Sequence, residues 1–209
     1  AAVEYEDCLG IWTGTGVGGA LVLSGRLYRG PQFTAGEIGH TTVLPGAGLG
    51  RETLEQLASR TAIVGTLTDL MRSSHPSTLS AMVDADYAQI RSKIVSRAVL
   101  AGDSLAIRVV RDAARLTGIA AANLITTLSL PCVVLGGGLA TALGDPWAEW
   151  VGESVAEHVW PESLPEVKVL IAALGDDSGT IGAAIAARES FSSGTERLHR
   201  TWMASGDAL

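Results

Sequence analysis

A glycine-rich stretch near the start of this 209-residue chain contains residue types that can bind phosphate. It reads Thr13-Gly14-Thr15-Gly16-Val17-Gly18-Gly19. Bare backbone N–H groups can converge on an anion where side chains would block its approach, and the hydroxyls of Thr13 and Thr15 would add donors. We therefore predict phosphate contacts at Thr13, Gly14, Thr15 and Gly16. A tight turn without a ligand is the alternative that the spacing leaves open.

Two familiar nucleotide motifs do not explain this stretch. Gly14, Gly16 and Gly19 have the spacing G-x-G-x-x-G, but a dinucleotide fingerprint needs a helix immediately afterwards. The next residues, 20–28, read ALVLSGRLY and are typical of strand and turn. No Gly-Lys-Ser/Thr follows, which excludes the P-loop. A phosphate site here would have to be a glycine hairpin.

Glu37 and His40 are a second candidate for chemistry. They lie three residues apart in a glycine-rich segment just before a predicted strand. A carboxylate and an imidazole can each hold vicinal sugar hydroxyls by paired hydrogen bonds. The pair is therefore a candidate for hexose binding.

Composition and charge exclude several classes of protein. The formal net charge of −7 argues against a nucleic-acid-binding surface, which needs clustered Lys and Arg. Two cysteines, Cys8 and Cys132, are too few for a disulfide-stapled secreted domain, and we expect both as small core residues. The uncharged run 116–144 is interrupted by Asn123, Pro131 and a glycine triplet, so no membrane span is expected. An acidic cytoplasmic enzyme fits these features.

The hydrophobic pattern places these residues among strands and helices. Strands are predicted over 7–13, 20–23, 26–28, 41–44, 132–135 and 167–172. Helices are predicted over 53–73, 84–100, 105–128, 147–159 and 178–189, with Asp103 as part of the cap of the third. Short strands followed by helices with interspersed buried strands predict an α/β or mixed sheet covered by helices.

Three blocks, taken in order and with their spacing, resemble the signature of the ROK family of bacterial sugar kinases and sugar-responsive repressors. They are residues 13–19 (TGTGVGG), 25–30 (GRLYRG) and 35–40 (AGEIGH). Residues 135–139 (LGGGL) resemble the family's adenosine-side glycine motif, and residues 178–184 (SGTIGAA) resemble its closing helix. The resemblance extends from about residue 9 to residue 188.

The resemblance implies a fold and a set of partners. The fold is an α/β lobe of the actin-like ATPase (ribonuclease H-like) class, with a mixed sheet flanked by helices. Residues 1–190 would be the larger, C-terminal lobe, 191–209 a polar tail, and the N-terminal lobe would be absent from the chain. The implied partners are ATP with Mg²⁺, a hexose or N-acetylated amino sugar, and a second copy in a homodimer, with no membrane or nucleic acid.

The resemblance also implies residue roles. The first hairpin would contact the nucleotide phosphates, and Gly136, Gly137 and Gly138 would lie on the adenosine side. Glu37 and His40 would contact the sugar. Glu55, in Thr53-Leu54-Glu55, matches a third sugar-contacting Glu at the head of the next helix. Without the resemblance, Glu55 would be interpreted as an ordinary first-turn acid favoured by the helix dipole.

One departure from the family pattern concerns zinc. The family commonly places three cysteines between the motif His and the third Glu, and together with that His they hold a structural zinc ion. Residues 46–53 here read GAGLGRET, without cysteine. Because a structural zinc site takes four N or S ligands, we predict no zinc and expect hydrogen bonds to orient His40.

A second departure concerns the catalytic base. In the family, this base is an Asp in an Asn-Asp pair on the smaller lobe, and the chain contains no such pair. Five acids, Asp84, Asp86, Asp103, Asp176 and Asp177, lack any motif of a base. We therefore predict no catalytic residue here and an inactive fragment. A sugar kinase when full length is the leading hypothesis; a non-catalytic sugar-sensing regulator and a degenerate sugar-binding homologue are the alternatives.

Overall fold

The chain forms two compact units, Ala1–Ala172 and Ala173–Leu209, each with most of its contacts within itself. A computed structural model describes residues 1–46, 52–161 and 167–192. The second unit, in its described part, contains a short 3-10 turn, η3 (Gly175–Asp177), and one helix, α8 (Ser178–Ser192). The predicted loose tail lies beyond residue 192, outside the described residues.

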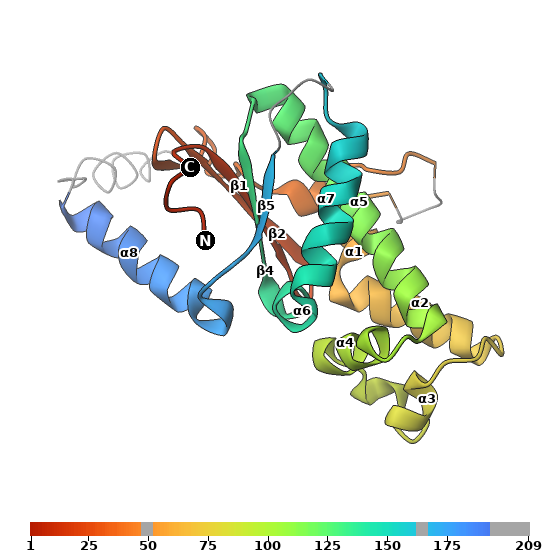
Figure 1. Cartoon of the computed structure of the whole chain (residues 1–209). Helices are drawn as coiled ribbons and strands as arrows, with labels where there is room; N and C mark the ends of the chain where they lie inside the picture. The colour runs from red at the N-terminus through yellow and green to blue at the C-terminus, as the bar shows by residue number, and fades with distance from the viewer. Residues whose placement is uncertain (47–51, 162–166, 193–209) are drawn as a thin grey trace, which may run out of the picture. The chain divides into compact units, whose positions relative to one another are not determined.

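One sheet organises the first unit (Figure 1). Its five strands are ordered β3-β2-β1-β4-β5. Their bounds are Cys8–Thr13 for β1, Val17–Leu23 for β2, Arg26–Tyr28 for β3, Cys132–Gly136 for β4 and Lys168–Ile171 for β5. The first three strands pair antiparallel, whereas β1, β4 and β5 are parallel. The predicted hairpins and mixed sheet are confirmed.

The topology brings two glycine stretches to one edge of the sheet. Because β1 and β4 are parallel neighbours, their carboxyl ends meet at the same edge. There, β1 leads into the hairpin loop 14–16, and β4 leads into the glycine triplet 136–138. The loop is followed by β2, whereas a dinucleotide-binding motif requires a helix at this place, so the structure agrees with the rejection of that motif.

Helices of the first unit supply the rest of its core. Figure 1 shows α5 and α7 side by side over one face of the sheet. The bounds are Leu54–Ala58 for α1, Arg60–Arg72 for α2, Leu79–Met82 for α3, Ser92–Leu100 for α4, Ser104–Leu128 for α5, Gly137–Leu143 for α6 and Asp145–His158 for α7. Two 3-10 turns, η1 (Ile38–His40) and η2 (Tyr87–Gln89), complete the unit's regular structure in the described ranges. None of the described helices is long and apolar enough to cross a bilayer.

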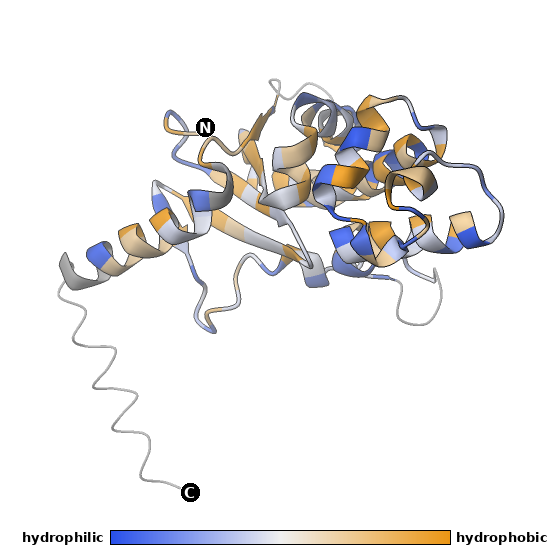
Figure 2. Ribbon diagram, turned by 90° about the horizontal axis from the view of Figure 1, so that it is seen from below, coloured by the Kyte–Doolittle hydropathy of each residue, from blue (hydrophilic) through white to orange (hydrophobic). Residues whose placement is uncertain are grey.

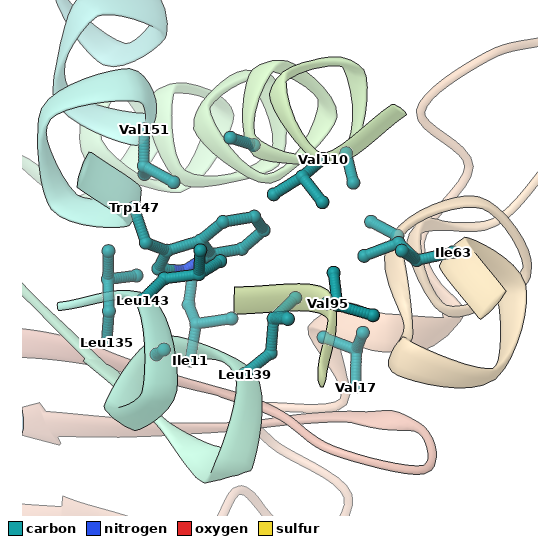
Figure 3. Packing of buried hydrophobic residues seen from close by; sticks show 14 of the residues in the cluster. Ile11, Val17, Ile63, Val95, Val110, Leu135, Leu139, Leu143, Trp147 and Val151 are labelled. Atoms are coloured by element: carbon teal, nitrogen blue, oxygen red, sulfur yellow. The ribbon is translucent and has the colours of Figure 1, made fainter. Parts of the chain in front are cut away.

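Trp147 occupies the centre of the core. Its fully buried ring lies among Leu139 and Leu143 of α6 and Ile11 and Leu135 of neighbouring strands (Figure 3). Figure 2 shows hydrophobic residues along the strands, and on the helices hydrophobic residues alternating with hydrophilic ones. This packing fixes β1 and β4, and with them the glycine-rich edge.

Three predicted elements differ from the structure for local reasons. The helix over 53–73 is two helices, because Ser59 is extended (φ −64°, ψ 157°) and its hydroxyl accepts from the Ala62 N–H at 3.1 Å to begin α2. The helix over 84–100 begins at Ser92, since Asp84 and Ala85 have left-handed φ values of 47° and 60°. The strand over 41–44 is wrong: this segment has one isolated bridge, from Thr42 to Thr53.

Asp103 begins the longest helix, as predicted. Its Oδ1 accepts from the Ala106 N–H at 2.9 Å, and its Oδ2 accepts from the hydroxyls of Ser77 (2.9 Å) and Thr78 (2.7 Å). Burial alone would raise the pKa of Asp103, but these hydrogen bonds outweigh it and hold the pKa below its ordinary value of 3.8. The carboxylate therefore ties the connection before α3 to the start of α5.

Replacing Asp103 with Ala should lower the free energy of unfolding by about 1–3 kcal/mol, because a cap is lost and buried donors are left unpaired. Since the folded pKa is depressed, the ionised form stabilises the protein above about pH 4, and this contribution is lost as pH falls through the folded pKa. Urea unfolding at a series of pH values measures both effects. Asp112→Asn, on the exposed side of α5, is the control and should change little. Equal stability of Asp103→Ala and wild type at pH 7 would contradict this role.

The two cysteines should be poorly reactive in the native protein. Both are free; Cys132 is fully buried and Cys8 is half-buried. Burial, followed by the neighbouring Cys8, raises the pKa of Cys132 to about 11, so almost none of it is thiolate at pH 7. We expect Ellman's reagent to label Cys132 only after unfolding. Rapid labelling of both thiols in the folded protein would contradict this expectation and show that β1 and β4, which carry the two cysteines, separate in solution.

Candidate functional site

The hairpin loop between β1 and β2 has a defined backbone. The Gly14 N–H donates to the Gly16 carbonyl at 2.9 Å, which closes the turn. The N–H groups of Thr15 and Gly16 have no hydrogen-bond partner in the part of the chain that the structure describes. Two of the loop's amides are thus available to an anion, while the Gly14 amide is already engaged.

Glu55 contacts the hairpin directly. A capping box between Thr53 and Gln56 starts α1 and places Glu55 in its first turn. From there Glu55 Oε2 accepts a hydrogen bond from the Val17 N–H at 2.9 Å. A Cβ on residue 16 would overlap this carboxylate, so only glycine at Gly16 permits the approach. The second carboxylate oxygen remains an acceptor for a ligand hydroxyl.

The segment that carries Glu37 and His40 also touches the hairpin. Both side chains are exposed, by 62% and 67%, and His40 Nε2 lies 3.9 Å from Glu37 Oε2. Between them, Gly39 packs so closely on Val17 that a Cβ would overlap the Val17 carbonyl oxygen. Val17 is therefore hydrogen-bonded to Glu55 through its N–H and packed against Gly39 through its carbonyl.

The backbone links the two candidate sugar-binding segments to each other. Thr41, the residue after His40, accepts from the Leu54 N–H at 3.1 Å through its carbonyl. Its hydroxyl donates to the Ile38 carbonyl at 2.7 Å. The structure thus brings the segments carrying Glu37, His40 and Glu55 together at the start of β2.

The glycine triplet after β4 lies against the end of β1. Gly137 has a φ of +85°, and a Cβ there would lie 2.5 Å from the Thr13 carbonyl oxygen. Gly136 faces the Trp12 ring at similarly close range, while Gly138 has room near Ser92. Close packing requires glycine at two of the three predicted adenosine-side positions.

Thr13, which we predicted as a hydroxyl donor to phosphate, is buried. It is 1% exposed, and its Oγ1 has no hydrogen-bond partner in the described part of the chain. Its role in phosphate binding remains a prediction, as do those of the other loop residues. Thr15 is the exposed hydroxyl of the loop.

The acids set aside as catalytic bases lie at turns and at the ends of helices. Asp103 and Asp86 cap α5 and η2, respectively. Asp84 lies in a left-handed turn, and Asp177 ends η3 in the second unit. The absence of a catalytic base from this chain stays a prediction.

Hydrogen bonds hold the edges of the segment in which the family commonly has zinc ligands. Glu52 Oε1 accepts from the Gly46 N–H at 3.1 Å, and the Glu52 carbonyl accepts from the Val43 N–H at 2.9 Å. Residues 47–51 lie outside the described residues. Across the described ranges, no three His, Cys, Asp or Glu side chains are grouped to hold a metal ion. The absence of zinc stays a prediction.

Sequence reasoning missed Arg60 and Thr61, at the start of α2. Arg60 Nη2 donates to Thr15 Oγ1 at 2.8 Å, and Thr61 Oγ1 donates to the Thr15 carbonyl at 2.7 Å. The only signal for them was their place directly after Ser59, which caps the helix. That place does not reveal which loop they contact.

Comparison with known proteins agrees with this fold. The mixed sheet flanked by helices is an α/β lobe of the actin-like ATPase fold. The crystal structure of a ROK family glucokinase from Streptomyces griseus, in complex with glucose and AMPPNP, matches it with a TM-score of 0.82 and 29% identity, over 90% of this chain and 62% of that one. The sequence matches the ROK family over residues 1–190, and the chain belongs to this family.

Curated relatives are sugar kinases by name. A glucokinase from Halalkalibacterium halodurans is 35% identical over 182 residues, which is 85% of this chain and 54% of that protein. An N-acetylmannosamine kinase from Escherichia fergusonii is 30% identical over 189 residues, 88% of this chain and 58% of that protein. The chain therefore spans little more than half the length of these relatives.

Gly39→Ala should disturb the site through packing alone. The added methyl group would overlap the Val17 carbonyl, and we expect a loss of about 1–3 kcal/mol in unfolding free energy. Gly65→Ala, in an exposed position of α2 with nothing within 4 Å, is the matched control and should stabilise by up to about 1 kcal/mol. Thermal unfolding compares the two. Similar shifts in the same direction would contradict the tight contact.

Proposed function

We propose that the full-length protein phosphorylates a hexose or N-acetylated amino sugar with ATP, and that this chain contributes part of the phosphate, adenosine and sugar sites. Residues 1–190 would then be the larger, C-terminal lobe. The relatives named above, one of them solved with glucose and AMPPNP, support this proposal. Homodimerisation and a cytoplasmic location stay predictions.

The contact between Glu55 and Val17 is the observation that carries the proposal. Phosphoryl transfer requires the acceptor hydroxyl and the terminal phosphate to lie within contact of each other. Glu55 is bonded to Val17, the residue directly after the loop whose free amides, those of Thr15 and Gly16, suit a phosphate. A sugar hydroxyl held by Glu55 would thus lie beside a phosphate held by the hairpin.

Each group of this chain has a limited task in the proposed reaction. Glu55 and the Glu37–His40 pair would orient the sugar, and the loop amides would hold the phosphate. Mg²⁺ bound with the nucleotide neutralises phosphate charge. We assign no residue of the described ranges to this ion. The proton acceptor is expected in the N-terminal lobe.

Formation of ADP by the full-length protein tests the proposal against hexoses and N-acetylated amino sugars. Turnover with at least one sugar is expected. Sugar binding without turnover would favour the sugar-sensing regulator, and neither binding nor turnover would favour the degenerate homologue. Either outcome contradicts the kinase proposal.

Glu55→Gln should lower kcat/KM for the sugar by about 10- to 100-fold, since a hydrogen bond to a charged group contributes about 1.5–3 kcal/mol. The amide oxygen can still accept from Val17, so the fold should be preserved. Glu153→Gln removes an exposed carboxylate that pairs with Arg111 on the helices and is the matched control. If both variants kept wild-type kcat/KM, Glu55 would have no role in binding the sugar.

A further inference from the structure

Arg60 is hydrogen-bonded to the hairpin loop between β1 and β2. It is the first residue of α2, and its own N–H donates to the Gly14 carbonyl at 2.9 Å. Its guanidinium donates to the Thr15 hydroxyl at 2.8 Å, and the neighbouring Thr61 donates to the Thr15 carbonyl. Three hydrogen bonds from two consecutive residues thus fix the loop.

The charge of Arg60 is not neutralised within the described part of the chain. No ion pair joins it to a carboxylate there, and its one hydrogen-bonded side-chain partner is a neutral hydroxyl. A cation in the first turn of a helix also opposes the helix dipole, which costs roughly 0.3–1 kcal/mol. Beside the glycine loop, Arg60 thus places a cation that has no ion pair within the described residues.

The contact leaves both groups able to bind an anion. A guanidinium has five N–H donors, and its contact with Thr15 occupies one of them. The Thr15 hydroxyl accepts from Arg60 and still has its own O–H to donate. Together with the free amides of Thr15 and Gly16, these are the donors that the loop and Arg60 offer to an anion. Arginine suits phosphate oxygens because its planar fork can bind two of them at once.

We propose that the Arg60 guanidinium binds the terminal phosphates of the nucleotide, beside the Thr15 hydroxyl that it orients. The inference rests on the proposed function, because it takes the loop 14–16 as the phosphate loop. It adds a cation to a site whose other donors are neutral. Such a cation would also stabilise charge on the phosphoryl group during transfer.

Nucleotide titrations of the full-length protein test this inference. Arg60→Gln should weaken binding of AMPPNP about 10- to 100-fold and leave AMP binding unchanged, because AMP lacks the terminal phosphates. Arg60→Lys keeps the charge and should recover part of the affinity. Arg72→Gln, at the exposed other end of α2, is the matched control and should bind AMPPNP like wild type.

A second measurement separates phosphate binding from mere support of the loop. The dependence of AMPPNP affinity on salt concentration should be weaker in Arg60→Gln than in wild type, since one cationic contact is lost. Equal weakening of AMPPNP and AMP would show a structural role and overturn the inference. Unchanged AMPPNP affinity in Arg60→Gln, or no AMPPNP binding by wild type, would overturn it as well.

The two proposals fail in distinguishable ways. Wild-type protein that binds AMPPNP in an Arg60-dependent manner but does not phosphorylate any sugar would contradict the proposed function and keep the inference. Sugar phosphorylation by wild type, with AMPPNP affinity unchanged in Arg60→Gln, would contradict the inference alone.

Discussion

The peptide groups of Val17 hold the candidate site together. The Val17 N–H donates to Glu55, and the Val17 carbonyl is covered by Gly39. One residue at the start of β2 is therefore in contact with both segments that are expected to bind sugar. Because β2 is paired with β1 from Val17 to Val22, this residue cannot shift without disturbing the sheet.

The glycines around Val17 follow from this constraint. At Gly16 and Gly39 a side chain would occupy space that already contains a carboxylate or a backbone carbonyl. These positions do more than permit a turn, since they let separate pieces of backbone touch. The same is true of Gly137, which lies on the backbone of Thr13 at the neighbouring strand end. The glycine-rich motifs thus assemble one edge of the sheet.

The sequence predicted those features that depend on neighbouring residues. The two hairpins formed by β1, β2 and β3 were predicted from the local hydrophobic pattern and turn residues, and the long helix after Asp103 from its apolar periodicity and cap. The break at Ser59 was missed because periodic apolar residues continue across it, and the left-handed turn at Asp84 was missed at the predicted start of the next helix. A periodic pattern of apolar residues does not reveal a single residue whose φ and ψ angles are not helical.

The sequence predicted which residues belong to the candidate site but not the hydrogen bonds that connect them. The family resemblance identified Glu37, His40 and Glu55, yet the bond from Val17 to Glu55 joins residues 38 positions apart. Arg60 had no signal of its own, because its partner Thr15 is 45 positions away. Contacts of this range depend on how helices are placed on the sheet, which periodicity does not specify.

A crystal structure of the full-length protein with a hexose and AMPPNP would test the central claim most directly. The account predicts a sugar hydroxyl within about 3 Å of Glu55 and a terminal phosphate at the same distance from the Thr15 and Gly16 amides, with the Val17–Glu55 bond intact. Ligands bound away from this hairpin, or a Glu55 side chain turned away from both Val17 and the sugar, would contradict it.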